Sequence, residues 1–312
     1  MLFGEWLDEW LANYVEQNAK TRTYLHYLRI CKNHIKPKLG GLLLEDITAY
    51  SLQRLVAELL RCGNLKNGGA LSSNSVNSII TVIRLALKQA YDVGLTSAYV
   101  GDGIKRPRSV ERRVECFTLA EQRRIEEYVI NEDRSGRFFG VLLCLYTGLR
   151  IGELMALDWE DINLRESELY VTKNCYFEKG SDGRYGRRTD TPKTPSSERT
   201  VPLPARLLPY IRAAKKKSRS PHVVSGSRGE VSVRSYQRSF SDLLARLGIR
   251  HRGFHSLRHT YATRAIECGM DVRSLSEILG HKSPTVTLNR YAHSLMEHKR
   301  AMVNRLGKLF PP

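Results

Sequence analysis

The stretch HSLRHTYATRAIECG, residues 255–269, combines a helical pattern with closely spaced histidine and arginine residues. We predict that it forms a helix. His255 and Arg258 are three residues apart, so one face of that helix presents both side chains to the same group. An imidazole transfers protons near neutral pH, and a guanidinium binds anions through a fixed fork of donors. The stretch therefore predicts a helix that carries a site for an anion.

Other segments carry side chains of the same kinds. In TGLRIGEL, Arg150 follows a glycine at a helix start, where the positive end of the helix suits anions, and Glu153 lies one turn on to pair with it. TPKTPSSERTVPLP contains Lys193, LGHKSP places His281 at a helix-ending turn, and Tyr291 follows ten residues later. Each residue alone has an ordinary structural explanation. Together the candidates provide a phosphate clamp, proton-transfer groups and a nucleophile: Arg150, Lys193, His255, Arg258, His281 and Tyr291.

The first hundred residues are predicted to form a bundle of about four helices, with no strand signal. Apolar residues recur at helical spacing between Trp6 and Tyr14. Three further helices are expected near residues 21–34, 47–60 and 72–94, and Ser and Gly residues cap the last of them. This part of the chain is therefore expected to be all-helical.

A charged segment without periodicity follows, spans residues 102–116, contains Pro107 and is typical of a linker. We therefore divide the chain into a helical domain (1–101), a basic linker (102–116) and a second domain (117–312) with a tail helix at its end.

The second domain is predicted to mix helices with a small amount of sheet. ELYVTKNCYF and SERTVPLP are β-prone runs on either side of a long polar stretch, which indicates an antiparallel sheet with an extended hairpin or loop. The remaining segments have helical patterns. The expected fold class is mainly α with a small antiparallel β-sheet, an α+β arrangement.

The charge of the chain points to a polyanionic partner. Fifty Lys and Arg against thirty-two Asp and Glu leave a formal net charge of +18. Nucleic acid is the partner that such an excess favours, and a solvated basic face or an anionic membrane surface is the alternative. The run GRYGRR, residues 183–188, is either a DNA contact or a solvated loop tip. The DNA-binding candidates are Lys105, Arg106, Arg108, Arg184, Arg187 and Arg188.

Cysteine usage and hydropathy bear on the compartment. The six cysteines form no CxxC pair and no short-range framework, so neither a zinc knuckle nor a disulfide scaffold is indicated. No stretch approaches the ~18 to 20 apolar residues that a membrane span requires. The amino terminus lacks the pattern of a signal peptide. We expect a soluble, cytoplasmic protein.

The motifs of the second domain resemble those of the tyrosine recombinases, also called phage-type integrases. TGLRIGELMAL, TPKTPSSERTVPLP, HSLRHTYAT, EILGHKSP and LNRYAH occur in the order of that family's motifs and at similar separations. The resemblance covers residues ~117 to 298 closely. The first hundred residues resemble the family's helical core-binding domain more loosely. Several short motifs in one order make the resemblance specific.

The resemblance implies a role for each candidate. Tyr291 would attack a scissile phosphate and leave a 3′-phosphotyrosyl link, which conserves the energy of the bond without ATP. Arg150 and Arg258 would bind the non-bridging oxygens, and Lys193 would protonate the departing 5′-oxygen. Lys173 and Lys179 compete for that last role. His255 would assist proton transfer with Tyr291, and His281 would hydrogen bond the phosphate.

The resemblance also implies partners. The expected partners are double-stranded DNA at a recombination site, a Holliday junction and three further copies of the chain, with an accessory directionality factor as a further possibility. No metal or other cofactor is expected. The apolar stripe of the tail helix, which includes Val303 and Leu306, docks either on a neighbouring copy or on its own domain. The hairpin insertion favours an integrase of a conjugative transposon or prophage over a chromosome-dimer resolvase.

Three other functions fit part of the pattern. A metal hydrolase would use His251, His255 and His259, which are spaced four apart, but the arginine among them repels a cation. A non-catalytic, sequence-specific DNA-binding protein needs only charge and helices, which leaves the six chemical positions unexplained. A type IB topoisomerase would share the clamp and the nucleophile, whereas the compact length and the spacing before Tyr291 favour a recombinase.

Overall fold

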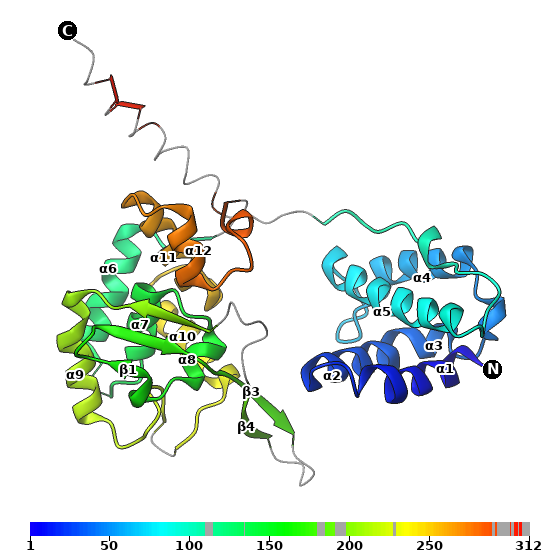
Figure 1. Ribbon diagram of the computed structural model, residues 1–312, viewed down its shortest axis with the longest axis horizontal. Helices are drawn as coiled ribbons and strands as arrows, with labels where there is room; N and C mark the ends of the chain where they lie inside the picture. The colour runs from blue at the N-terminus through cyan, green and yellow to red at the C-terminus, as the bar shows by residue number, and fades with distance from the viewer. Residues whose placement is uncertain are drawn as a thin grey trace. The chain divides into compact units, whose positions relative to one another are not determined.

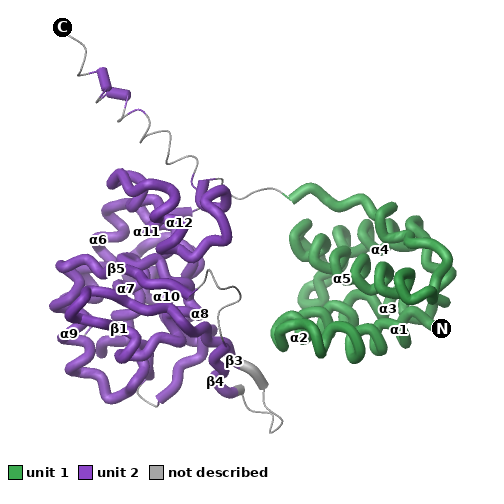
Figure 2. Tube along the Cα trace, in the orientation of Figure 1, with its two compact units in different colours: residues 1–112 green, residues 113–312 purple. Residues whose placement is uncertain are grey.

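The computed structural model describes residues 1–109, 115–133, 135–179, 185–190, 198–226, 229–288, 291, 300, 303–304 and 306–307. The chain forms two compact units, Met1–Arg112 and Arg113–Pro312, which Figure 2 colours separately. The first is helical, and the second combines helices with short antiparallel strands (Figure 1). The predicted fold class, mainly helical with a small amount of antiparallel sheet, is confirmed.

Unit 1 is built from helices around one apolar core. Trp6, Trp10 and Ile80 are among its buried residues, and the Trp6 ring nitrogen donates a hydrogen bond to the Ala86 carbonyl. The hydroxyl of Ser72 accepts a hydrogen bond from the Ser75 amide and caps the longest helix. The helices are α1 (Phe3–Trp10), α2 (Thr21–Ile30), α3 (Lys36–Leu39), α4 (Ala49–Cys62) and α5 (Ser73–Asp92), with π-helical turns at Leu11–Val15 and Cys31–Ile35.

The segment expected as a linker begins on unit 1. Ile104 is buried in the core of unit 1, and the Lys105 amide donates a hydrogen bond to the Gln53 side chain. The Asn77 side chain donates to the Pro107 carbonyl, and Arg106 donates to Thr81 and to the carbonyl of Asn77. Residues 104–107 are therefore attached to α4 and α5 instead of standing apart from them.

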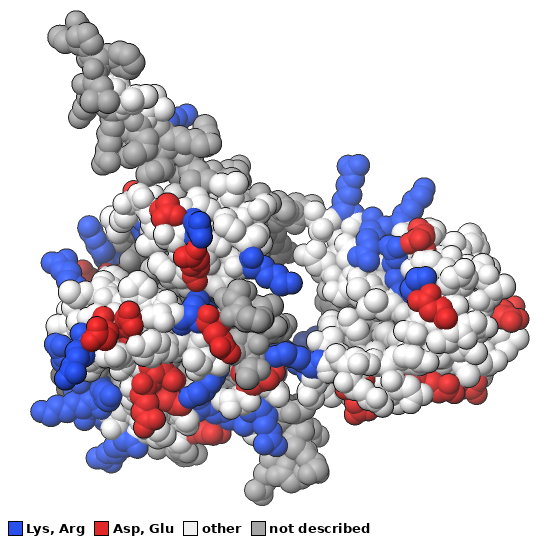
Figure 3. Space-filling view, viewed as in Figure 1, with Lys and Arg blue, Asp and Glu red and all other residues white. Residues whose placement is uncertain are grey.

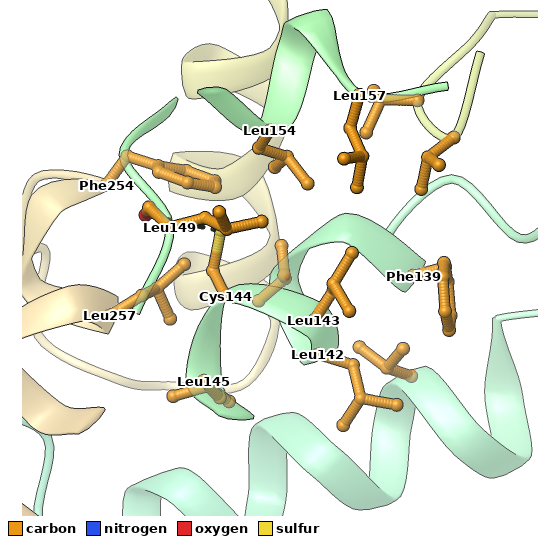
Figure 4. Packing of buried hydrophobic residues seen from close by; sticks show 14 of the residues in the cluster. Phe139, Leu142, Leu143, Cys144, Leu145, Leu149, Leu154, Leu157, Phe254 and Leu257 are labelled. Carbon is orange, nitrogen blue, oxygen red and sulfur yellow. Dashed lines mark hydrogen bonds between the residues drawn. The ribbon is translucent and has the colours of Figure 1, made fainter. Parts of the chain in front are cut away.

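Unit 2 is organised around α7 (Phe139–Thr147), nearly all of whose residues are buried. Figure 4 shows Leu142, Leu143 and Cys144 of this helix among apolar side chains from other segments, including Leu154 and Phe254. The other helices of this unit are α6 (Leu119–Glu127), α8 (Ile151–Ala156), α9 (Leu208–Lys217), α10 (Val233–Arg246), α11 (His255–Glu267) and α12 (Val272–Leu279).

The strands of unit 2 form two separate antiparallel sheets. One has the order β1–β2–β5, and the other is the hairpin β3–β4. In the first sheet Val171 of β2 pairs with Arg199 of β5. In the hairpin Tyr176 pairs with Arg188. The strands are β1 (Ile162–Asn163), β2 (Glu168–Val171), β3 (Asn174–Lys179), β4 (Tyr185–Asp190) and β5 (Arg199–Pro202).

The surface charges, the cysteines and the hydropathy of the helices complete the description of the fold. On the face that Figure 3 draws, acidic and basic side chains lie side by side on unit 2. All six cysteines are free thiols; Cys62 and Cys268 are exposed, and Cys31, Cys144 and Cys175 are buried. Over the described residues, no helix is both long and apolar enough to cross a membrane.

Candidate active site

Three arginines meet at the carboxyl end of α12. Arg199 donates from Nε to the Ile278 carbonyl at 2.5 Å, Arg258 donates from Nη2 to the Leu279 carbonyl at 2.6 Å, and Arg150 donates from Nη2 to the Gly280 carbonyl at 2.8 Å. A helix leaves its last carbonyls without partners, and its carboxyl end attracts cations. The end of α12 therefore gathers guanidinium groups from β5, from α11 and from the start of α8.

Arg258 is held in the interior of unit 2. Its side chain is 1% exposed and also donates from Nη1 to the Gly148 carbonyl at 2.9 Å. Gly148 ends α7 with φ +65°, and a Cβ there would lie 2.6 Å from Tyr261 and 2.8 Å from Leu279. Burial, reinforced by the charge of Arg150, lowers the pKa of Arg258 to about 9, so the group stays a cation at neutral pH.

Glu153 is the carboxylate of this cluster and is 5% exposed. It accepts hydrogen bonds from the Arg150 amide at 2.8 Å and from Arg150 Nη1 at 2.6 Å. Arg199 donates to both of its oxygens, at 3.1 and 2.8 Å. Burial alone would raise the pKa of the Glu153 carboxyl, but the hydrogen bonds and charges of Arg199 and Arg150 outweigh burial and lower the pKa to about 2. The carboxylate is therefore ionised throughout the physiological pH range.

Tyr291 lies beside the histidines of α11. Its hydroxyl is 2.7 Å from Nδ1 of His259, and the tautomer of that ring decides which of the two atoms donates. The His255 and His259 rings meet edge to face with centroids 4.5 Å apart. The Tyr291 side chain is 2% exposed and belongs to the same apolar cluster as Leu275 and Leu279 of α12. The structure thus brings the predicted nucleophile against the helix that carries Arg258.

His281 follows α12 directly. The helix ends at Gly280 with φ +62°, and the His281 amide donates to the Ser276 carbonyl at 3.0 Å. His281 Nδ1 lies 2.7 Å from the Thr287 hydroxyl. Because Gly280 accepts from Arg150 and precedes His281, one tight turn positions both parts of the predicted site.

The predicted lysine, Lys193, lies outside the described residues. Its competitor Lys173 pairs with Asp158 at 2.9 Å and lies 3.6 Å from Asp161. The hydrogen bond that Lys173 donates to Asp158 raises the pKa of Lys173. A lysine that donates a proton needs a lowered pKa, so these contacts count against Lys173 as the acid.

The DNA-binding candidates divide by location. Arg184 lies outside the described residues. Lys105, Arg106 and Arg108 are exposed on the segment attached to unit 1, where Arg106 also bonds Thr81. On the hairpin, Arg188 is exposed, whereas Arg187 is half-buried and donates to the Met155 carbonyl of α8 at 2.8 Å. Arg187 therefore fastens the hairpin to α8.

Two residues of the site were not among the predicted set. The sequence indicated Arg199 only as part of the β-prone run SERTVPLP, and His259 only as a metal-binding candidate. Arg199 is 6% exposed, and a buried arginine requires a partner, but the sequence does not identify Glu153 as that partner. His259 lies four residues after His255 on the same helix, and this spacing is the sequence signal that the two rings share a helical face.

The histidines do not form the metal site of the hydrolase hypothesis. His251 precedes α11 and contacts the Ser241 hydroxyl at 3.1 Å, so it does not share a helical face with His255. Across the described ranges, no group of three or more His, Cys, Asp or Glu side chains is placed to hold a metal ion.

Comparisons with known proteins cover nearly the whole chain. The model of the "Phage integrase family" matches residues 120–298, and that of the "Phage integrase, N-terminal SAM-like domain" matches residues 2–60. The chain is 28% identical to a tyrosine recombinase XerC-like protein of Caldanaerobacter subterraneus subsp. tengcongensis, over 98% of this chain and 83% of the relative. It is 24% identical to the ICEBs1 integrase of Bacillus subtilis, over 94% of this chain and 80% of the relative.

Solved structures share the fold. The Tn1549 transposon integrase in complex with a circular intermediate DNA superposes with a TM-score of 0.82 at 20% identity, covering 98% of this chain and 99% of that one. A lambda integrase dimer bound to a COC′ core site gives a TM-score of 0.69 at 20% identity, covering 93% and 95%. The fold, helices with short antiparallel strands, is therefore one that these proteins share.

Proposed function

The chain belongs to the phage integrase family of tyrosine recombinases, and we propose that it cuts and rejoins DNA at specific sites through a covalent link to Tyr291. One observation carries the proposal. Arg150 and Arg258 both bind the carboxyl end of α12, which His281 follows, and Tyr291 contacts His259 on the helix that carries Arg258. A guanidinium pair beside a hydroxyl suits attack on a phosphodiester.

The proposed first step exchanges one phosphoester bond for another. The Tyr291 oxygen forms a bond to phosphorus, the bond from phosphorus to the 5′-oxygen breaks, and a 3′-phosphotyrosyl link with a free 5′-hydroxyl results. Arg150 and Arg258 stabilise the charge that builds on the non-bridging oxygens. The reverse attack by a 5′-hydroxyl rejoins the strand, so the cycle consumes no ATP.

Proton transfers complete the step. The tyrosine proton leaves through the histidine pair of α11, with His259 as the hydrogen-bond partner of Tyr291 and His255 beside it. Lys193 gives a proton to the departing 5′-oxygen, and His281 hydrogen bonds the phosphate. Since Arg258 and Tyr291 are buried here, both side chains must become accessible when DNA binds.

The partners follow from the same chemistry. Two duplexes exchange strands through a Holliday junction, which requires four copies of the chain. The structures with the same fold include Tn1549 integrase with transposon end DNA and a lambda integrase tetramer bound to a Holliday junction. Exchange of the tail helix between copies and an accessory directionality factor belong to the proposal as well. An integrase of a mobile element is the favoured branch, because the ICEBs1 integrase and the Tn916 transposase are among the relatives.

Covalent capture tests the function. The purified chain is incubated with fragmented DNA in excess EDTA, denatured, and the DNA that remains attached to protein is sequenced. We expect adducts at defined sequences, and none with Tyr291→Phe. Because phosphate is held by side chains in the proposed mechanism, EDTA leaves the yield unchanged.

Two controls make the outcome specific. Tyr176→Phe removes a tyrosine hydroxyl from the hairpin of the same unit and should leave the adducts in place. Filter binding of Tyr291→Phe should match that of the wild-type chain, since the hydroxyl contributes to chemistry and not to affinity. Adducts that persist in Tyr291→Phe would contradict the assigned nucleophile.

A further inference from the structure

Arg199 lies beside the proposed site, has no role in the sequence-based assignment, and donates hydrogen bonds from all three of its guanidinium nitrogens. Its Nε donates to the Ile278 carbonyl, and its two terminal nitrogens donate to the two oxygens of Glu153. Its backbone is fixed by pairing with Val171 in the sheet. A Cβ on Gly280 would lie 3.0 Å from Arg199 Nη1, so the turn after α12 also packs directly on this side chain.

The charges of the cluster explain why a third arginine matters. Glu153 alone would neutralise Arg150, and a phosphate approaching that pair would meet a buried carboxylate as well as a cation. Arg199 shares the charge of Glu153. Three guanidinium groups and one carboxylate leave two net positive charges for an incoming phosphate.

We propose that Arg199 is a positioning residue of the recombination site: it neutralises Glu153 and holds the end of α12, so that Arg150 keeps its orientation and an unneutralised charge for the scissile phosphate. This inference rests on the function proposed above. Arg199 acts through Glu153 and the Gly280 turn and does not itself touch the phosphate.

The proposal makes a pH-dependent prediction that a purely structural arginine does not make. Within the described residues, Glu153 faces Arg150 at the start of α8, Arg199 of β5, Arg258 of α11 and Cys144 of α7. Without Arg199, the Glu153 carboxylate would repel the phosphate until it takes up a proton. A variant that lacks Arg199 should therefore recover activity relative to wild type as the pH falls.

The experiment measures single-turnover adduct formation at saturating concentrations of a captured DNA site. We expect Arg199→Gln to slow the rate constant on the order of 100-fold, with little change in DNA affinity. Adding Glu153→Gln restores the two net positive charges, so the double variant should regain at least about tenfold of that loss. Between about pH 8 and pH 5, the ratio of the Arg199→Gln rate to the wild-type rate should rise, and the ratio for the double variant should stay flat.

Control variants separate positioning from stability. Arg252→Gln removes another half-buried arginine that pairs with a glutamate, Glu121 at 3.0 Å, and should lower the melting temperature without changing the rate or its pH dependence. Arg199→Lys keeps a positive charge beside Glu153 on a single donor nitrogen and is the matched variant if Arg199→Gln fails to fold. We expect it to lose less rate than Arg199→Gln, and its ratio to the wild-type rate should stay flat between about pH 8 and pH 5.

The outcomes distinguish this inference from the function on which it rests. A wild-type chain without adducts on any DNA would overturn the proposed function. Wild-type adducts with an Arg199→Gln rate within about threefold of wild type would overturn the role of Arg199 alone. Equal losses of rate in the single and double variants, with pH-independent ratios to the wild-type rate, would show that Arg199 only supports the structure. That result would also overturn the proposed positioning role.

Discussion

At the scale of single residues, Glu153 links the stability of unit 2 to pH. The pKa of its carboxyl group is about 2 in the folded chain, whereas the ordinary value for glutamate, which applies to the unfolded chain, is 4.5. A carboxylate whose pKa is depressed by folding stabilises the protein above its ordinary pKa and loses that contribution as the pH falls toward the folded value. The stability that ionised Glu153 contributes to unit 2 is therefore lost as the pH falls from about 4.5 to about 2.

We predict that Glu153→Gln flattens this acid dependence. Between pH 7 and pH 3, the wild-type unit should lose about 2 kcal/mol more unfolding free energy than the variant, from the two pKa values and the linkage relation. Urea titrations followed by Trp159 fluorescence, with Trp6 and Trp10 replaced by phenylalanine, measure the unfolding of unit 2. Glu160→Gln, an exposed carboxylate in the same unit, should leave the acid dependence unchanged. Equal acid dependence in wild type and Glu153→Gln would contradict the prediction.

The sequence predicted single residues where a motif or a spacing marked them. Arg150 beside its glycine, and Arg258 three positions after His255, could be found because local spacing places them at a helix start and on a helix face. The pairing of Arg199 with Glu153 could not be found in this way. Those residues lie 46 positions apart, and only the packing of β5 against the end of α12 brings the arginine to the carboxylate.

At the scale of elements, α8 is held between the core and the β3–β4 hairpin. Arg187 of β4 donates to the carboxyl end of α8, and a Cβ on Gly152 would lie 2.2 Å from the Asn174 side-chain oxygen and 3.2 Å from the Cys175 carbonyl. Glycine is therefore needed at position 152 because β3 passes directly over it. Since Arg150 begins α8, the position of the hairpin affects the orientation of that arginine.

We predict that Gly152→Ala separates the hairpin from α8. The added methyl group meets the Asn174 side chain, and such overpacking costs about 1 to 3 kcal/mol. Asn174→Ala in the same chain should recover part of that cost. Melting temperatures give the size of the effect, and faster hydrogen exchange in 174–179 shows where it acts. Gly186→Ala, which has open space around its Cβ, serves as the control. Unchanged exchange in β3 despite a lower melting temperature would place the disturbance elsewhere.

Helices were easier to predict than the pairing of strands. The three-residue spacing of Thr118 and Glu121 is typical of a capping box, and both of its hydrogen bonds are present, at 2.8 and 3.2 Å. The two β-prone runs predicted a small antiparallel sheet with an extended hairpin or loop, but they did not predict which strands pair: β2 pairs with β5, and β3 and β4 form a separate hairpin. Strand partners depend on contacts between distant segments, and β2 pairs with β5 across the whole hairpin insertion.

At the scale of the whole molecule, the two units have separate cores. Among the residues that the structure describes, Ile104 is the last in the core of unit 1 and Phe117 is the first in the core of unit 2. The charge composition favoured a nucleic-acid partner, but it does not indicate how far the first core extends. The sequence placed the end of the first domain at residue 101 because periodicity stops there, and the contacts of residues 104–109 involve side chains that no periodic pattern reveals.

We predict that a fragment of residues 1–109 is more stable than a fragment of residues 1–101. The longer fragment keeps Ile104 in the core, and burying such a side chain contributes about 1.5 to 3 kcal/mol. Thermal unfolding followed by circular dichroism compares the two. Ile104→Ala in the longer fragment should remove most of its additional stability. Arg108→Ala, a substitution at an exposed residue, should leave the stability unchanged. Equal melting temperatures for both fragments would show that residues 104–109 add nothing to unit 1.

The cysteines supply a pair of native attachment points for spectroscopic labels. Cys62 and Cys268 are the exposed thiols and lie in different units, whereas burial raises the pKa of Cys31 to about 12 and that of Cys144 still further. The thiolate is the reactive form, so buried thiols of this kind resist maleimide reagents. Burial also raises the pKa of the half-buried Cys116, and Cys116→Ser removes that intermediate case. A donor and an acceptor dye can then report, molecule by molecule, whether the separation of the two units changes when a DNA duplex is added.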